Sequence, residues 1–245
     1  MGELIAFLSG KGGTGKTSVC AAVATALAKQ GESVLCIDCD VGLRNLDIAL
    51  AMTDQGALSF REVYAGDYEL QQAAAHPLYP TLRFLTAPVN CTAADIDGEA
   101  FGALLQEARK HFRYIFLDAP AGVEAGFMLA ARHADRVVVV TVTDPASIRD
   151  AARTGEVLEL MGKTQVRLVV NRINEKLYEA GKFTVDDVID QTGMQLLGIV
   201  PEDPAVVLAA AFEKPLIAYT KKGAAAACGR IASRLQGYHI PLTMK

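Results

Sequence analysis

Residues 4–17 read Leu-Ile-Ala-Phe-Leu-Ser-Gly-Lys-Gly-Gly-Thr-Gly-Lys-Thr, an apolar run that leads directly into a glycine-rich loop. Residues 10–17 match the pattern G-x-x-x-x-G-K-S/T, in which glycines let successive backbone N–H groups turn toward a polyphosphate. The apolar run predicts a strand before the loop, and Ala and Leu at helical spacing predict a helix over 17–30. Strand, loop and helix in this order are the context that a phosphate-binding loop requires.

The pattern also assigns roles to individual residues of the loop. Lys16 should reach the β- and γ-phosphate oxygens and act catalytically by neutralising their charge, and Thr17 should ligate Mg²⁺. The helix that follows presents its N-terminus to the anion. The predicted cofactor-binding residues of the loop are Gly10, Lys11, Gly12, Gly13, Thr14, Gly15, Lys16, Thr17 and Ser18.

A second lysine, Lys11, lies one residue after the first glycine, at the mouth of the loop. It is either a solvated lysine or a cation that reaches the phosphates of a nucleotide bound by a second molecule. Residues 11–17 carry the deviant Walker A signature, and from here the chain resembles the MinD/ParA family of ATP-dependent dimerising switches. The resemblance implies ATP and Mg²⁺ as cofactors, an ATP-dependent homodimer, and a catalytic role for Lys11 across the dimer interface.

Length and composition limit how many domains the chain can form and which binding partners it is expected to have. The chain has 245 residues, 51% of them apolar, and no linker-like break, so one α/β domain is expected over 1–236 with a short tail over 237–245. With 24 basic and 28 acidic residues, the net charge of −4 argues against broad binding to nucleic acid or to an anionic membrane. The N-terminus starts the first predicted strand and no apolar span of about 18 residues occurs, so a cytoplasmic protein is expected.

The five cysteines are expected to be free thiols in such a protein. Cys36 and Cys39 satisfy C-x-x-C, but they flank the end of a predicted strand, where alternating side chains point to opposite faces. We therefore assign them no redox or metal role.

Strands and helices alternate along the chain. Several predicted strands are continuous Val, Ile and Leu runs, as expected for parallel strands covered on both faces by helices. This predicts a doubly wound, mostly parallel α/β sheet with ligands at the carboxyl ends of the strands. The predicted strands are 4–9, 33–38, 83–86, 114–118, 137–142, 166–171 and 196–200, and the predicted helices are 17–30, 98–111, 124–133, 146–161, 185–191 and 224–235.

An acidic pair follows the second predicted strand. Asp38 and Asp40, two residues apart in an extended segment, project to the same side. A carboxylate beside Mg²⁺ and ATP can orient the attacking water. Residues 38–47 closely resemble the MinD form of the family's switch I, which implies that Asp40 is catalytic and needed for hydrolysis. We assign Asp38 a supporting place near the magnesium ion.

The run Tyr-Ile-Phe-Leu-Asp over 114–118 has the Walker B arrangement, four apolar residues and then a carboxylate. Asp118 is expected to hold Mg²⁺ together with Thr17. Gly122 supplies a backbone N–H that can approach the γ-phosphate closely and move when it leaves. Residues 118–124 resemble the family's switch II in its MinD form.

Three further segments are assigned mainly by resemblance. Asp144 and Pro145 mark a turn before a helix that Asp144 or Ser147 could cap, and the resemblance places residues 141–150 at the dimer interface. Asn171 ends a strand with an amide that can donate to and accept from a purine edge. In MinD-like proteins the end of this strand and the end of the next strand contact adenine. The resemblance therefore implies that adenine is contacted here by Asn171, Arg172, Pro201, Glu202 and Asp203.

The C-terminal segment departs from the family. MinD proteins usually finish with an amphipathic helix that holds the ATP dimer on the inner leaflet. In residues 234–245, Gly237 and Pro241 interrupt any helix, and one lysine attracts anionic lipid only weakly. Either this tail frays after the last helix, or its apolar residues give a weak peripheral association with the inner face of the membrane.

Three classes of function fit these motifs. The favoured class is a MinD-type spatial regulator, in which slow ATP hydrolysis, stimulated by a regulatory protein partner, resets the dimer that positions the division site. A ParA-like or flagellar-number relative acting on DNA or a protein platform is disfavoured, because the basic residues near the last helices are only Lys221, Lys222, Arg230 and Arg234. The third class is a metabolic ATPase on the same fold. Its iron-protein version needs cysteines near switch II, and none lies between residues 91 and 228.

Overall fold

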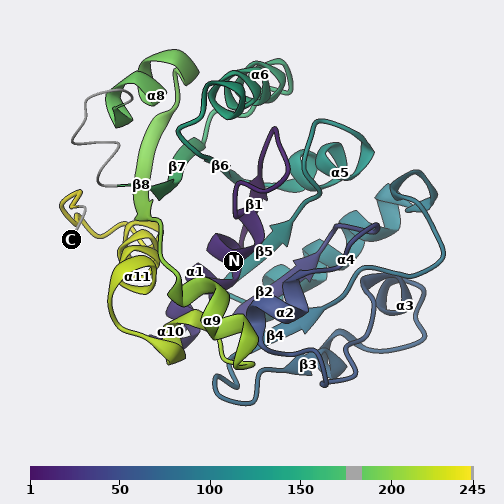
Figure 1. The fold of residues 1–245 in the computed structure, drawn as a ribbon. Helices are drawn as coiled ribbons and strands as arrows, with labels where there is room; N and C mark the ends of the chain where they lie inside the picture. Colours follow the sequence, from purple (N-terminus) through teal and green to yellow (C-terminus); the bar gives the residue numbers. More distant parts are fainter. Residues whose placement is uncertain (175–183, 244–245) are drawn as a thin grey trace.

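A central sheet organises the molecule. The computed structural model describes residues 1–174 and 184–243, and within these residues the sheet has eight strands in the order β3-β4-β2-β5-β1-β6-β7-β8 (Figure 1). Neighbouring strands are parallel, except that β3 runs antiparallel to β4. The strands are β1 (Glu3–Leu8), β2 (Val34–Asp38), β3 (Ala74–Ala75), β4 (Leu82–Leu85), β5 (Tyr114–Asp118), β6 (Arg136–Thr141), β7 (Val166–Ile173) and β8 (Gln195–Pro201).

Helices cover both faces of this sheet (Figure 1). One layer contains α1 (Lys16–Lys29), α2 (Leu46–Leu50), α9 (Ala205–Ala211), α10 (Leu216–Tyr219) and α11 (Gly223–Leu235). The other contains α3 (Phe60–Tyr64), α4 (Gly98–His111), α5 (Ala125–His133), α6 (Pro145–Leu160) and α8 (Val185–Thr192). Two 3₁₀ turns, η1 (Leu70–Gln72) and η2 (Ala93–Asp95), lie in the connections. None of the helices that the structure describes is long and apolar enough to cross a bilayer.

The hydrophobic core lies in two clusters, one on each side of the sheet. Alternate residues of each strand supply them, so Ile5 and Phe7 of β1 belong to one cluster and Leu4 and Leu8 to the other. Phe7 and Phe116, on the neighbouring strands β1 and β5, contact each other with ring centroids 4.9 Å apart. Burial on both faces explains why the strands read as continuous apolar runs.

The predicted fold class is confirmed, with small differences at the ends of elements. All seven predicted strands and all six predicted helices are present, each within two residues of its predicted bounds. Helix α6 begins at Pro145 because Asp144 caps it by accepting a hydrogen bond from the Ser147 N–H. The elements that the sequence did not predict, β3, α2, α3, α9 and α10, are too short to show a periodicity. The five cysteines are free thiols, as expected.

The order of the strands changes direction at β1. From β1 the chain proceeds to β2 and β4 on one side of the sheet, and later to β6, β7 and β8 on the other. In open α/β sheets ligands bind at such a switch point, beyond the carboxyl ends of the strands. The loops after β1, β2 and β5 carry the predicted phosphate-site residues, so the topology gathers them at one edge of the sheet.

Candidate functional site

The glycine-rich loop occupies residues 9–15, between β1 and α1. Gly13 and Gly15 have φ angles of 83° and 82°, a left-handed conformation that other residues rarely adopt. A Cβ atom at Gly15 would also lie 2.3 Å from Nδ2 of Asn171, so only glycine fits there. Among the described residues no side chain caps the start of α1 at Lys16. An uncapped helix N-terminus of this kind favours an anion.

One buried polar atom supports phosphate binding in this loop. Thr14 is 3% exposed, and its Oγ1 has no hydrogen-bond partner in the part of the chain that the structure describes. Leaving a buried hydroxyl without a partner costs about 1–3 kcal/mol. A phosphate oxygen in the loop would accept this hydrogen bond, so the residues present fit a polyphosphate.

Lys16, Thr17 and Asp118 form a connected group beside the loop. Lys16 Nζ lies 2.5 Å from Asp118 Oδ1, and Thr17 Oγ1 donates to Asp118 Oδ2 at 2.7 Å. The Lys16 and Asp118 side chains are only 8% and 2% exposed. The structure therefore brings the predicted Walker B carboxylate to the two loop residues that are expected to meet phosphate and Mg²⁺.

Asp38 lies next to Asp118, because these residues are register partners at the ends of β2 and β5. Its Oδ1 accepts the backbone N–H of Asp40 at 2.9 Å, and its Oδ2 accepts that of Leu46 at 3.1 Å. Burial, and after it the charge of Asp118, raises the pKa of Asp38 to about 7. Asp38 thus holds the loop that follows β2 and places a second carboxyl group beside Asp118.

The donor set fits a hard, oxygen-liganded cation. No group of three or more His, Cys, Asp or Glu side chains arranged to hold a metal occurs within residues 1–174 and 184–243. The oxygens at hand are the Thr17 hydroxyl and the carboxylates of Asp118 and Asp38. Mg²⁺ is typically bound by one or two such groups together with water and substrate phosphates. These residues therefore suit a magnesium ion that arrives with a nucleotide.

Asp40 faces the same cavity as the loop, but its carboxylate is engaged locally. Its Oδ1 accepts the backbone N–H groups of Gly42 at 3.1 Å and Leu43 at 3.2 Å. These bonds fix the turn over residues 40–43, which shapes the segment between β2 and α2. Oδ2 is the oxygen of Asp40 that these bonds leave available to a water molecule.

For three predicted residues of the loop and switch II, Lys11, Gly10 and Gly122, the structure shows contacts that the sequence did not predict. Lys11 is exposed, and its Nζ lies 3.4 Å from Asp144 Oδ1. Gly10 packs against α6, where a Cβ atom would lie within 2.5 Å of the Asp150 carbonyl oxygen. The N–H of Gly122, whose φ is 93°, donates to the Ser9 carbonyl at 2.9 Å, so in this conformation that group binds the loop itself.

A cavity of about 400 Å³ opens over the loop and extends away from it. Its polar end is formed by the loop, and its other wall is mostly apolar, which matches a molecule with a phosphate chain at one end and a base at the other. The sequence analysis missed this wall, although an apolar run over 205–212 followed by Glu-Lys-Pro marks part of it. The missed lining residues are Leu43, Asn45, Ile48, Ala49, Val206, Ala209, Ala210, Lys214 and Leu216.

Of the residues expected to contact a base, the structure places some in the lining of the cavity and others outside it. Arg172, with a φ of 52°, lines the cavity. Asn171 is buried under the loop, where its Nδ2 donates to the Thr14 carbonyl at 2.8 Å. Asp203 accepts the N–H of Ala205 at 2.9 Å and the N–H of Ala224 at 2.9 Å, and so caps α9 and α11.

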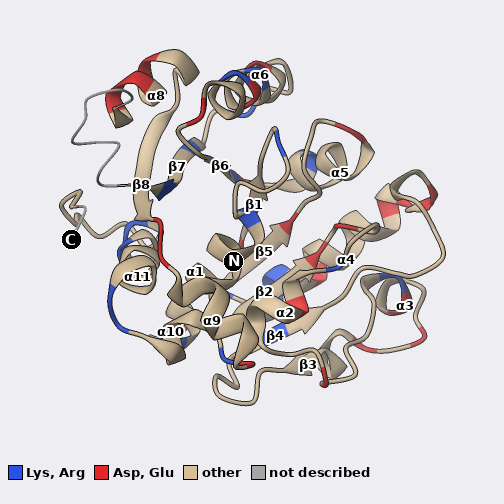
Figure 2. Cartoon of the chain, viewed as in Figure 1, with Lys and Arg blue, Asp and Glu red and all other residues tan. Residues whose placement is uncertain are grey.

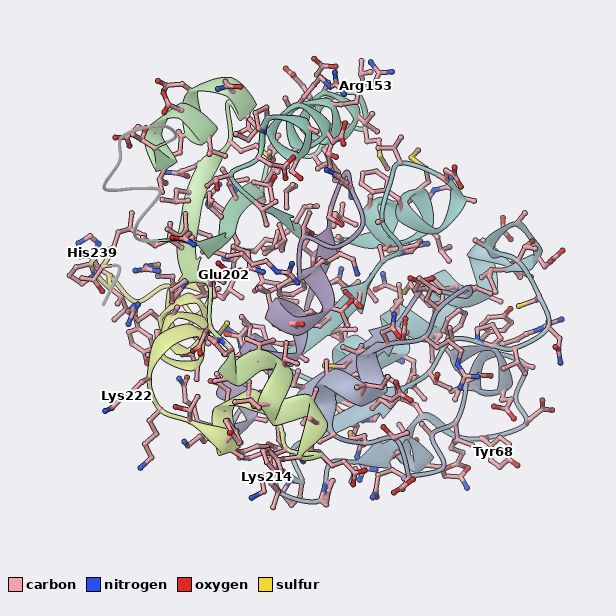
Figure 3. All side chains as sticks on the ribbon, viewed as in Figure 1. Tyr68, Arg153, Glu202, Lys214, Lys222 and His239 are labelled. Carbon is pink, nitrogen blue, oxygen red and sulfur yellow. The ribbon has the colours of Figure 1, made fainter. Side chains whose placement is uncertain are left out.

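The last two residues expected to contact a base are Glu202 and Pro201. Glu202 lies at the end of β8 (Figure 3), and its Oε2 accepts from Asn174 Nδ2 at 3.3 Å. The described residues that line the cavity include neither of these two, nor Asn171 or Asp203. Base contact by these four residues stays a prediction.

Comparison with known proteins agrees with this site. Residues 5–216 match the model of the CobQ/CobB/MinD/ParA nucleotide binding domain. The septum site-determining protein MinD of Synechocystis is 33% identical over 98% of this chain and 92% of the relative. A structure of the Aquifex aeolicus MinC:MinD cell division protein complex aligns with a TM-score of 0.91 at 35% identity, covering 98% of each chain. MinD from Pyrococcus horikoshii, solved with Mg-ADP, aligns with a TM-score of 0.83 at 25% identity over 96% of each chain.

Proposed function

Because the chain belongs to the CobQ/CobB/MinD/ParA family of nucleotide-binding proteins, we propose that it is a MinD-type ATPase that uses ATP and Mg²⁺ to position the division septum. The observation that carries this proposal is the grouping of the glycine-rich loop and Asp40 at the polar end of one cavity with a mostly apolar far wall, where Asp118 binds Lys16 and Thr17 of the loop. Nucleotide and Mg²⁺ binding by the Pyrococcus relative supports the cofactors.

Individual residues have separate tasks in hydrolysis. The loop N–H groups and Lys16 bind the β- and γ-phosphate oxygens, and Thr17 and Asp118 hold the metal. Bound Mg²⁺ supplies positive charge that offsets the charge developing on the phosphates. Asp40 orients the attacking water with the carboxylate oxygen that its own turn leaves available. Burial of the Lys16–Asp118 pair excludes water from the phosphate end and strengthens these interactions.

ATP brings two subunits together in this proposal. Lys11, exposed at the mouth of the loop, then meets the nucleotide of the second subunit, and a regulatory protein partner stimulates hydrolysis. The MinC:MinD complex of Aquifex supports a protein partner for this chain. The protein works in the cytoplasm, with weak peripheral association at the inner face of the membrane.

The contacts of the basic residues near α11 support the proposal that this region does not bind DNA. The guanidinium of Arg234 donates to the backbone carbonyls of Leu197, Ile240 and Pro241 at 3.0, 3.0 and 2.7 Å. Arg230 donates to the Thr243 carbonyl at 3.1 Å. The remaining positive charge of this region, Lys221 and Lys222, lies just before α11 (Figure 2). Two of the four basic residues there are therefore used to hold the tail.

The test separates ATP binding, dimerisation and membrane association. Asp40→Ala should retain ATP and accumulate as a dimer with Mg²⁺–ATP in light scattering, whereas Lys16→Ala should stay monomeric. Lys11→Ala should bind nucleotide but lose hydrolysis. A monomeric Asp40→Ala protein at saturating Mg²⁺–ATP would contradict the role of Asp40 and the proposed switch.

Membrane association is tested on the same Asp40→Ala protein by sedimentation with anionic liposomes, in full length and truncated after Leu235. Pelleting that needs both ATP and the tail supports a membrane switch. A dimer that stays in solution would instead indicate recruitment by a protein partner.

A further inference from the structure

Helix α2 forms part of the cavity wall, although it has only five residues. Ile48 and Ala49 line the cavity, whereas Leu46 and Leu50 are buried in the core cluster that also contains the apolar side of α1. A helix this short is not stable in isolation, because its first turn fixes several residues for a single hydrogen bond. Contacts with other elements must therefore determine where α2 lies.

Side chains from two other elements hold the ends of α2. At its start, the backbone N–H of Leu46 donates to Asp38 Oδ2 at 3.1 Å. At its end, the carbonyl oxygen of Leu50 lies 2.9 Å from Nε2 of His76, a residue 26 positions further along the chain. The last carbonyl groups of a helix have no partner within the helix. His76 thus satisfies a buried carbonyl group that α2 itself leaves unpaired.

Local hydrogen bonds define the protonation state of His76. Its Nδ1 accepts the backbone N–H groups of Leu78 at 3.0 Å and of Tyr79 at 3.3 Å, so the proton of the neutral ring is on Nε2. The Nε2–H group therefore donates to the Leu50 carbonyl. His76 is 1% exposed, and this burial, only partly offset by the hydrogen bond to Leu50, keeps the pKa of His76 below its ordinary value of about 6.5. The ring is neutral at pH 7.5.

The segment that carries His76 is anchored to the sheet. His76 directly follows β3, and its backbone N–H donates to the Leu82 carbonyl of β4 at 2.9 Å. The Tyr79 N–H also donates to the His76 carbonyl at 3.2 Å, and the two rings lie with their centroids 5.2 Å apart. His76 is therefore a fixed point at the edge of the sheet, and α2 is the element that it positions.

We propose that His76 is a positioning residue, which fixes the orientation of α2 through the Leu50 carbonyl. Ile48 and Ala49 then face the cavity at the place where a nucleotide binds. The proposal rests on the proposed function, in which this cavity holds the nucleotide. Burial of Leu46 and Leu50 keeps α2 on the core, but apolar burial has no preferred direction. The hydrogen bond supplies the direction, because it weakens steeply as its angle departs from linear.

Two substitutions in the full chain separate the two hydrogen-bonding atoms of His76. Asparagine in His76→Asn keeps an acceptor near the position of Nδ1 but has no atom that reaches the Leu50 carbonyl. Glutamine in His76→Gln is longer, and its amide N–H can reach that carbonyl. The matched control is His133→Asn, the same exchange in α5 on the other face of the sheet, where the ring packs edge-on against Phe101 with centroids 5.9 Å apart.

The dissociation constant of Mg²⁺–ADP is measured at pH 7.5 by isothermal titration calorimetry, since ADP is not consumed during the titration. His76→Asn should bind about three- to tenfold more weakly than the parent, as expected for the loss of one hydrogen bond, and His76→Gln should recover binding to within about twofold. His133→Asn should bind like the parent even where its Tm falls, which separates affinity from stability. Parental affinity in His76→Asn, or an equal loss in both His76 variants, would overturn the proposal.

A second measurement covers the case in which His76→Asn does not fold. Long-range ¹H–¹⁵N spectra of the parent should show His76 as the neutral tautomer with its proton on Nε2. A charged ring, or a proton on Nδ1, would overturn the proposal, because neither form is compatible with the hydrogen bonds from Leu78 and Tyr79. If the parent itself does not bind Mg²⁺–ADP, the proposed function fails instead, and the spectrum still reports whether His76 can donate to Leu50.

Discussion

Asp38 and Asp118 lie directly opposite each other at the ends of the neighbouring parallel strands β2 and β5. Both are 1% exposed, and Lys16 pairs with Asp118 alone. Asp38 has backbone N–H groups as its partners instead of a cation. Of two adjacent buried carboxyl groups, only one thus has a lysine partner, which makes the site dependent on pH and on the charge that a ligand adds.

The stability of the nucleotide-free protein should fall as pH rises. Burial and Asp118 raise the pKa of Asp38 to about 7, above the value of about 3.9 for an unfolded chain. The folded state therefore binds this proton more tightly, and the resulting stability, complete below about pH 4, is lost as pH rises through 7. Asp38→Asn should remove roughly 5 °C of the decline in Tm between pH 5 and 8. Equal slopes for variant and parent in differential scanning fluorimetry would refute this.

Removing Lys16 should destabilise the fold as well as abolish ATP binding. Lys16→Ala leaves the Asp118 carboxylate buried without its cation, and breaking one side of a buried pair costs about 3–5 kcal/mol. For a chain of this size the Tm of the nucleotide-free protein should fall by roughly 10 °C. Lys29→Ala, an exposed lysine at the other end of α1, is the control and should leave Tm unchanged.

Two glycines of the loop should respond differently to alanine. Gly15→Ala forces an alanine to a φ of 82° and places its Cβ 2.3 Å from Asn171 Nδ2. The Tm should fall by about 5 °C, because such backbone strain costs about 1–3 kcal/mol, and nucleotide binding should be lost. At Gly12 the structure describes no atom within 4 Å of an added Cβ, so Gly12→Ala should match the parent Tm. A Gly15→Ala protein that melts with the parent would show that the loop rearranges freely.

The tail should be held by Arg234. Arg234→Ala removes three hydrogen bonds that attach residues 240 and 241 to α11 and β8. Amide hydrogen exchange in residues 238–243 should become about tenfold faster, since one hydrogen bond to a charged group contributes about 1.5 kcal/mol. Arg153→Ala is the control, because Arg153 points outward from α6 (Figure 3). Rapid exchange already present in the parent would show that the tail is not held in solution.

The features that could be predicted are those that local sequence encodes. The run before Gly10 is a strand because its side chains are buried on both faces, and the acidic strand ends Asp38 and Asp118 meet because parallel strands align their carboxyl ends. The apolar wall of the cavity could not be predicted, since α2, α9 and α10 are too short to show a helical period.

The sequence also could not predict hydrogen-bond partners that lie far apart along the chain. The assignment of Asp203 to a base stays a prediction, but its carboxylate also binds the N–H of Ala224, a contact 21 residues away that no local pattern records. Neither alternative for the tail included the contacts of Arg234, because its carbonyl partner on β8, Leu197, is brought near only in the folded chain.

The carboxylate of Asp203 starts two helices at once, α9 on the wall of the cavity and α11 with the tail at its far end. A displacement of α9 by a bound base would therefore be transmitted to the first turn of α11 through a single side chain. One wall of the cavity and the start of the helix that leads to the tail are therefore joined by one carboxylate, on the same face of the sheet.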